Sequence, residues 1–273
     1  MKDHMKTAIK YIILIIIVLL ILIPLYLTIL YSIKTKESFI KSTYKLDLSG
    51  LTLDNFYKVL VQLKIYRKLF NSFITTIGGT SLTVLACLPA AYSMCKLKGK
   101  IYGILFAVLV VFAVMPEQIV IFSQYEMYLR LNINNFLSVI FSYTGKNIPE
   151  CLLFLCVIIK SVPGSIIEAA YIDGCKETTI IKSFIIPLSS SGIIIVSLNM
   201  FLNIWNDFLI PMVLIHEDEG KTIMQVLALI GERFQSNVPF QMAANIIAIL
   251  PPIIIYGVFK NRIIEHTYGD FLK

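Results

Sequence analysis

Three polar side chains, Asn203, Asn206 and Asp207, lie beside the chain's single tryptophan, Trp205, between two apolar stretches. Carboxylate and amide groups in such surroundings can hold an ion or form hydrogen bonds with a polar solute. A carboxylate that faced lipid would cost about 2.5–3.5 kcal/mol on insertion scales, so Asp207 must find a cavity or a polar partner. These residues therefore indicate either the lining of a translocation path or a structural polar contact with another subunit.

Two further places combine polar groups with apolar surroundings. Glu117 follows Pro116 near the far end of an apolar run, and we interpret it either as a path residue or as an acid at the membrane–water interface. A polar segment, residues 143–149, begins with Tyr143 and separates two short apolar runs. This segment predicts a cavity lining or, alternatively, a turn between two spans.

The sequence lacks the patterns of metal-dependent, nucleophilic or ATP-hydrolysing chemistry. His216 and Glu217 begin like a zinc-protease HExxH motif, but the second histidine is missing, so residues 216–220 predict a solvated acidic turn. There is no GxxxxGK[ST] phosphate loop, and no serine, histidine and aspartate form a convincing nucleophilic set. The five cysteines have no CxxC spacing and are expected to be structural free thiols.

The composition indicates a membrane protein. Hydrophobic residues make up 57% of the 273 residues and charged residues only 15%, against about 45–50% and about 25% in soluble domains. Mean hydropathy is +0.80. A soluble globule and a disordered chain are both excluded. The net charge of +7 comes from short basic clusters between apolar runs, so anionic lipid headgroups, and not nucleic acid, are the expected partners of these charges.

Apolar runs of about 20 residues predict an all-α integral membrane fold with six transmembrane helices in a single domain, residues 1–273. The first run follows three lysines but is too long for a signal-peptide core, so we expect it to remain as the first span. Residues 55–63 predict an amphipathic surface helix. The six spans are expected at residues 11–33, 70–94, 101–122, 136–159, 192–214 and 240–259.

Two of these spans are expected to be irregular. The polar segment 143–149 separates two runs that are each too short to cross a bilayer, so we predict an interrupted fourth span. Pro251 and Pro252 are expected to kink the sixth span. Charge does not decide the orientation, because twelve of the 24 Lys and Arg residues fall on the side of the chain termini and twelve elsewhere.

The connection between the fourth and fifth spans, residues 160–191, predicts a short amphipathic helix, a glycine turn and another helix. Ser165 is expected to cap the first helix, and Gly174 to end it with a positive φ. Its narrow apolar stripe of small side chains is expected to comprise Ile166, Ala169 and Ala170. A helix of this kind that also carries one acid, Glu168, is suited to fit a groove in another protein.

The spacing in this connection resembles the EAA loop of bacterial ABC importer permeases, in which Glu-Ala-Ala is followed after three residues by Gly and after nine more by Ile-x-Leu-Pro. Phe184 and Ile186 stand where that family usually has Ile and Leu, which are conservative changes. The resemblance implies that the helix docks on an ATP-binding subunit and moves with it. The coupling residues that it implies are Glu168, Ala169, Ala170, Asp173, Gly174 and Pro187.

Nearly the whole chain is similar to the sugar-importer branch of that family, typified by the smaller maltose-type permease subunit. Other segments that carry the similarity are Leu51–Phe56, Asn71–Ser72, Ala90–Tyr92, Trp205–Phe208 and Leu250–Pro252. The resemblance implies six spans with cytoplasmic termini in the bacterial inner membrane. Its implied partners are a second permease subunit, an ABC ATPase dimer and an extracytoplasmic solute-binding protein.

The same resemblance implies that this chain binds no cofactor, and that ATP and Mg²⁺ are bound by the partner ATPase. The solute would be a sugar or a related polar molecule. The candidates for its translocation path are Asn203, Asn206, Asp207 and Tyr143.

Two other interpretations remain open from the residues. In an ion-coupled secondary transporter, Asp207 and Glu117 would be proton or sodium sites and the broken fourth span would bind the solute. An intramembrane enzyme would need a catalytic pair, which we do not find. Neither interpretation requires the EAA-like loop.

Overall fold

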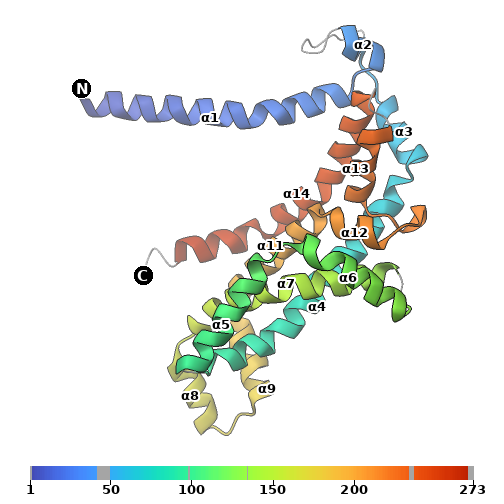
Figure 1. Cartoon of the computed structure of the whole chain (residues 1–273). Helices are drawn as coiled ribbons and strands as arrows, with labels where there is room; N and C mark the ends of the chain where they lie inside the picture. Colours follow the sequence, from blue (N-terminus) through green and yellow to red (C-terminus); the bar gives the residue numbers. More distant parts are fainter. Residues whose placement is uncertain (1, 42–49, 98, 134, 234–236, 270–273) are drawn as a thin grey trace. The chain divides into compact units, whose positions relative to one another are not determined.

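The computed structural model describes residues 2–41, 50–97, 99–133, 135–233 and 237–269, and nearly all of them are helical (Figure 1). Within these ranges no strand forms, and one isolated bridge pairs Lys34 with Leu51. The all-α prediction is confirmed. The long helices are α1 (Lys2–Ser32), α4 (Ile65–Cys95), α5 (Gly99–Val114), α7 (Asn135–Lys160), α11 (Ser190–Asn206) and α14 (Val238–Gly269). The shorter ones are α2 (Lys36–Lys41), α3 (Asp54–Gln62), α6 (Glu117–Arg130), α8 (Gly164–Ile172), α9 (Glu177–Ile180), α10 (Ile186–Leu188), α12 (Leu209–Leu214) and α13 (Ile223–Arg233).

Three helices are long and apolar enough to cross a membrane by themselves. They are Ile9–Ser32 within α1, the whole of α4, and Val238–Asn261 within α14. α14 continues as one helix through Pro251 and Pro252. Three helix pairs meet the same criterion only when joined across a bend: α5 with α6 at 88°, α7 with α8 at 78°, and the segment 177–188 with α11 at 79°. The described residues therefore hold three to six membrane spans.

The predicted third and fifth spans each cover two helices. α5 ends at Val114, because Pro116 disfavours helical backbone in the residue before it, and the chain then turns into α6. α11 ends at Asn206, and Asp207 has extended backbone before α12 begins. Pro211 has no N–H to donate to the Asp207 carbonyl, which removes one helical hydrogen bond at this break.

The prediction of an interrupted fourth span is wrong, because α7 continues through the polar segment as one helix. Its polar side chains are satisfied within the helix: Thr144 Oγ1 donates to the Ile140 carbonyl at 2.8 Å, and Asn147 Nδ2 donates to the Tyr143 carbonyl at 2.7 Å. Pro149 removes one helical hydrogen bond, which membrane helices tolerate when neighbouring helices cover them. The polar residues of the segment 143–149 therefore do not end α7.

The chain divides into two compact units, residues 1–67 with 226–250 and residues 68–225 with 251–273. In the first unit, Asn55 on α3 donates through Nδ2 to the carbonyls of Ser32 and Lys34 at 2.9 and 2.8 Å. Asn55 and Val59 are the buried residues of α3. The predicted surface helix is confirmed, and its buried face holds the end of α1.

In the second unit α7 is the central helix, and it contacts α5, α6, α11 and α12. Small residues allow close approach: a Cβ on Gly79 of α4 would lie 3.0 Å from the Tyr143 Cβ, and one on Gly192 of α11 would lie 2.7 Å from the Ile158 Cγ2. The five cysteines are free thiols, three of them buried, as expected. The helices are thus close-packed around α7.

Candidate functional site

The predicted helix, glycine turn and second helix are present in the connection 160–191. α8 and α9 are neighbouring short helices at one end of the second unit (Figure 1). The prediction that Ser165 caps α8 is wrong, because Pro163 holds the capping position and no side chain caps this end. At the other end, Gly174 has φ +75°, and its N–H donates to the Tyr171 carbonyl at 3.0 Å. The glycine turn is therefore confirmed.

α8 divides into a packed side and an open side. Ala170 is 2% exposed and packs in the core with Ile180 and Ile185. Ile172 is 87% exposed. Ala169 was expected in the apolar stripe but is exposed, because α8 packs on the core mainly through Ala170 and Ile167. The other predicted coupling residues on the open side are Glu168, Asp173 and Gly174. The open side therefore combines acids, a small residue and one large apolar side chain, which suits contact with another protein.

Pro187, the last predicted coupling residue, lies on α10 and is exposed. A turn of π-helix, Ile181–Ile185, precedes it. Pro187 has no N–H for the Ser183 carbonyl four residues earlier, and such a missing bond favours local widening of the helix. The proline thus stands where the chain leaves the loop and enters α11.

A polar network, for which the sequence analysis gave no indication, fastens α8 to the end of α4. Lys96, the residue after α4, places Nζ 2.5 Å from Glu177 Oε1 and 2.7 Å from the Tyr171 hydroxyl oxygen. The Tyr171 hydroxyl donates to the same carboxylate oxygen at 2.8 Å and lies 3.1 Å from the Tyr92 hydroxyl oxygen. We call these four residues the α8 anchor. No local pattern identifies it, because Lys96 and Glu177 are 81 residues apart.

Two of the predicted path residues, Tyr143 and Asp207, lie together inside the second unit. Tyr143 is 1% exposed, and its side chain lies beside the Asp207 carboxylate. Asp207 Oδ1 accepts the Leu209 N–H at 2.9 Å and so holds the break between α11 and α12. Tyr143 is therefore buried within the chain, and Asp207 is half-buried, with one carboxylate oxygen holding this break.

The other two predicted path residues, Asn203 and Asn206, are exposed on α11. Asn199, which the sequence analysis missed, is also exposed. Residues spaced by four and three positions share one face of a helix, so the three form one strip, which we call the asparagine strip. Its spacing was the sequence signal that could have identified Asn199. Asn199 Nδ2 donates to Glu150 Oε1 of α7 at 3.4 Å, which links the strip to the neighbouring helix.

Beside Glu150 lies a cavity of about 540 Å³, which we call the α6–α7 pocket. Its polar lining comprises Glu117, Gln118, Gln124, Lys146 and Glu150. Glu117, the acid predicted for the path or the interface, lies in the pocket wall and forms an ion pair with Lys146. Lys146 belongs to the segment 143–149, which was predicted as a possible cavity lining and does line this pocket through Gly145, Lys146 and Pro149. Gln118, Gln124 and Glu150 were not predicted, because each is an ordinary polar residue until α6 and α7 bring them together.

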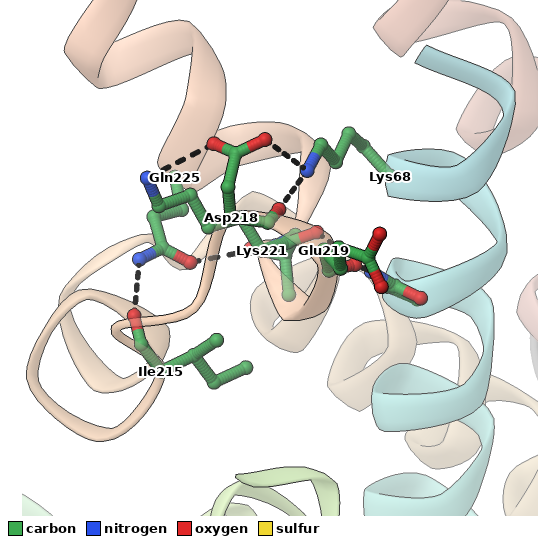
Figure 2. Close-up of polar contacts among 8 residues, drawn as sticks. Lys68, Ile215, Asp218, Glu219, Lys221 and Gln225 are labelled. Carbon is green, nitrogen blue, oxygen red and sulfur yellow. Dashed lines mark hydrogen bonds and ion pairs between the residues drawn. The ribbon is translucent and has the colours of Figure 1, made fainter. Parts of the chain in front are cut away.

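The acidic turn after α12 is solvated as predicted, since residues 216–219 are exposed, and it is also attached to the start of α4. Figure 2 shows Lys68 reaching from α4 to Asp218. Lys68 Nζ donates to the Asp218 carbonyl and lies 3.3 Å from its Oδ2, and the Lys68 side chain is 4% exposed. Asn71 Nδ2 donates to the carbonyls of Glu219 and Lys221 at 2.7 and 3.0 Å. We call these contacts the turn anchor.

The carboxylate of Asp218 remains 75% exposed within this anchor. The hydrogen bond from Lys221 is the main cause that lowers the pKa of Asp218; partial burial opposes this and Lys68 adds to it. In the part of the chain that the structure describes, no group of three His, Cys, Asp or Glu residues could hold a metal ion. The contacts from Lys68 and Asn71 attach the turn to α4.

Residues 82–266 match the family described as the binding-protein-dependent transport system inner membrane component. The chain belongs to this family. It is a membrane-embedded transport component, and the resemblance to importer permeases is confirmed. The function of such a component is transport and not an enzymatic reaction.

Two relatives match this chain over almost its whole length and over almost their own whole length. The multiple sugar-binding transport system permease protein MsmG of Streptococcus mutans serotype c is 28% identical over 269 residues, which cover 97% of this chain and 96% of the relative. The probable starch degradation products transport system permease protein AmyC of Thermoanaerobacterium thermosulfurigenes is 25% identical over 272 residues, which cover 100% and 99%.

Solved structures share the fold. A chain in the crystal structure of a bacterial ABC transporter involved in the import of the acidic polysaccharide alginate has a TM-score of 0.74 at 18% identity, over 95% of this chain and 97% of that chain. A chain of the bacterial alginate ABC transporter in complex with its alginate pentasaccharide-bound periplasmic protein has a TM-score of 0.68 at 14% identity, over 94% of each chain.

Proposed function

We propose that this chain is one of two permease subunits of an ATP-driven ABC importer in the bacterial cell membrane. With the second permease it forms the translocation path for a sugar or a related polar solute, which an extracytoplasmic binding protein delivers. The observation that carries this proposal is the open side of α8, where the residues of an EAA-like loop are exposed in a chain of the transport family.

Coupling to ATP hydrolysis takes place at α8 in this proposal. The exposed Glu168, Asp173 and Ile172 would contact a separate ATPase dimer, which binds ATP and Mg²⁺, while this chain binds no cofactor. The family membership and the absence of a phosphate loop in the sequence support this division. Because the α8 anchor ties Tyr171 and Glu177 to Lys96, a displacement of α8 would reach α4 directly.

The second permease subunit covers the asparagine strip in this proposal, and the solute passes between the two subunits. Exposed amides at membrane depth are costly against lipid and favourable against a water-filled path.

The proposed topology has six spans, in α1, α4, α5, α7, α11 and α14, with both termini on the cytoplasmic side. α8 lies on that side too, between the fourth and fifth spans. This arrangement makes the bent pairs single crossings with attached surface helices, which the bends of 78° to 88° permit.

The class of solute follows from the relatives. The names of the two relatives described above refer to multiple sugars and to starch degradation products, and the similar solved transporter is involved in the import of an acidic polysaccharide. A sugar or related polar solute is the class that these share. Ion-coupled secondary transport through Asp207 and Glu117 is not favoured, because this family works with binding proteins and Glu117 is paired with Lys146.

The test is ATP-driven uptake by vesicles that contain the whole importer with either Glu168→Gln or Gly174→Val. Gly174→Val forces a β-branched residue into φ +75°. Each variant is expected to reduce uptake at least about tenfold, the effect of about 1.4 kcal/mol of lost docking energy, while the chain stays in the membrane. Glu126→Gln, which removes an exposed acid of α6, is the matched control. Undiminished uptake by both α8 variants would overturn the coupling role.

A further inference from the structure

The α6–α7 pocket carries a negative charge that its own lysine does not balance. Glu117 and Lys146 form an ion pair and so neutralise each other. Glu150, four residues after Lys146, also lines the pocket, and its Oε1 accepts a hydrogen bond from the uncharged amide of Asn199. The lining therefore keeps the charge of one carboxylate, that of Glu150.

The pocket has the size and chemistry of a small-molecule site. Its volume of about 540 Å³ falls within the range of about 300–1,000 Å³ found for ligand pockets. The amides of Gln118 and Gln124 can each donate and accept hydrogen bonds, and Glu150 accepts them. Hydroxyl groups also donate and accept, so a polyhydroxylated molecule can satisfy all three side chains at once.

The position of the pocket connects it to the exposed polar face. Through Glu150 and Asn199 the pocket adjoins the asparagine strip. Met115, Phe112 and Ile210 form an apolar part of its wall, against which the apolar faces of sugar rings can pack. Polar groups thus extend from the pocket to the surface of α11 that the proposed function assigns to the path.

We propose that the α6–α7 pocket is a solute-binding subsite for an uncharged polyhydroxylated solute, and that Glu150 excludes acidic saccharides from it. This inference rests on the proposed function and deepens it by naming the solute class. A carboxylate on the solute would lie close to that of Glu150 in a partly enclosed site, where repulsion between like charges is stronger than in water. An uncharged solute hydrogen-bonds the same carboxylate without that repulsion.

The test measures protection of a thiol introduced by Gln118→Cys in the purified, detergent-solubilised importer. Its rate of labelling by a maleimide is followed, and the labelling of the five native cysteines in the unsubstituted chain is subtracted. The probes are four uncharged trisaccharides, maltotriose, cellotriose, xylotriose and arabinotriose, and one acidic trisaccharide, trigalacturonate. At least one uncharged probe is expected to slow the labelling, and trigalacturonate is expected not to.

Two variants that each remove one acidic charge then test whether Glu150 is the residue that excludes the acidic trisaccharide. Glu150→Gln is expected to lower the trigalacturonate concentration needed for protection at least about tenfold. Glu126→Gln removes an acid of α6 that does not line the pocket and is expected to change nothing. Equal protection of the starting protein by trigalacturonate and the uncharged probes would overturn the proposal. So would protection by none of the uncharged probes, or equal behaviour of the two charge variants.

The assay needs no ATP hydrolysis, so its failure is distinct from a failure of the proposed function. If the α8 variants leave uptake unchanged while the protection pattern holds, the coupling role is wrong and the subsite stands. If the α8 variants abolish uptake and no probe protects the thiol, the subsite is wrong and the coupling role stands.

Discussion

The two ends of α4 each carry a lysine that pairs with a carboxylate far away in the sequence, yet the two lysines differ in burial. α4 has 31 residues and is about 46 Å long at about 1.5 Å per residue. At its start, the Lys68 side chain is 4% exposed and contacts both the backbone carbonyl and the carboxylate of Asp218. After its end, the side chains of Lys96 and Glu177 are 40% and 54% exposed.

The difference teaches that one type of ion pair can serve two purposes. A hydrogen bond that involves a charged group contributes about 1.5–3 kcal/mol, whereas an exposed ion pair contributes about 0–1 kcal/mol. The turn anchor therefore stabilises the fold at the start of α4. The α8 anchor adds little stability, and its value lies in holding α8 in one orientation against α4.

The largest expected effect is on stability at the turn anchor. Lys68→Met keeps much of the side-chain volume but removes the donor to the Asp218 carbonyl. We expect the free energy of unfolding to fall by about 1.5–3 kcal/mol, measured as a lower midpoint of thermal unfolding of the purified importer. Lys58→Met removes an exposed ion pair with Asp54 and is the control. If the Lys68→Met protein is as stable as this control, the buried Lys68 contributes no more to stability than an exposed ion pair does.

An intermediate effect is expected at the α8 anchor, and on coupling more than on stability. Lys96→Glu and Glu177→Lys each place like charges together, and each is expected to lower stability by no more than about 1 kcal/mol. Both single variants should hydrolyse ATP with less dependence on solute and binding protein than the starting importer does. Combining the two restores the pair in reverse and should recover most of this dependence. A double variant no better coupled than the singles would contradict the positioning role.

The smallest effect concerns the pH dependence of the turn anchor. The pKa of Asp218 is lowered in the folded chain, so its contribution to stability is fully present above the ordinary aspartate value of about 3.9. It is lost as pH falls from there through the lowered value, because the carboxylate then takes up a proton. Thermal unfolding between pH 7 and pH 3 should therefore decline less steeply for Asp218→Asn than for the unsubstituted chain. Parallel curves for the two proteins would count against this contribution.

Local features of the fold could be predicted, and features that join distant segments could not. Gly174 ends α8 with the expected positive φ because a turn depends on adjacent residues. The fourth span was predicted to break at its polar segment, yet α7 is continuous, because Thr144 and Asn147 bond the backbone of their own helix. Helix length followed from backbone hydrogen bonding, and polarity at single positions did not override it.

The predicted site shows the same division. The EAA-like residues around Glu168 could be located because they are close in sequence and stand on one short helix. Asp207 was identified as an acid in need of a partner, but the sequence did not reveal that Tyr143 and the Leu209 N–H lie beside it. Glu150 and Gln118 gave no signal, since nothing in their neighbours distinguishes them from ordinary polar residues.

By itself, the sequence determined that this is a helical membrane protein of a transport family, and it predicted a short helix that docks on a partner. Those properties depend on the length of apolar runs and on motif spacing, which adjacent residues specify. Only the tertiary structure decided that Lys96 holds α8, that Lys68 holds the acidic turn, and that Glu150 gives the α6–α7 pocket its charge. These contacts join residues that are far apart in the chain, and packing of the helices brings them within bonding distance.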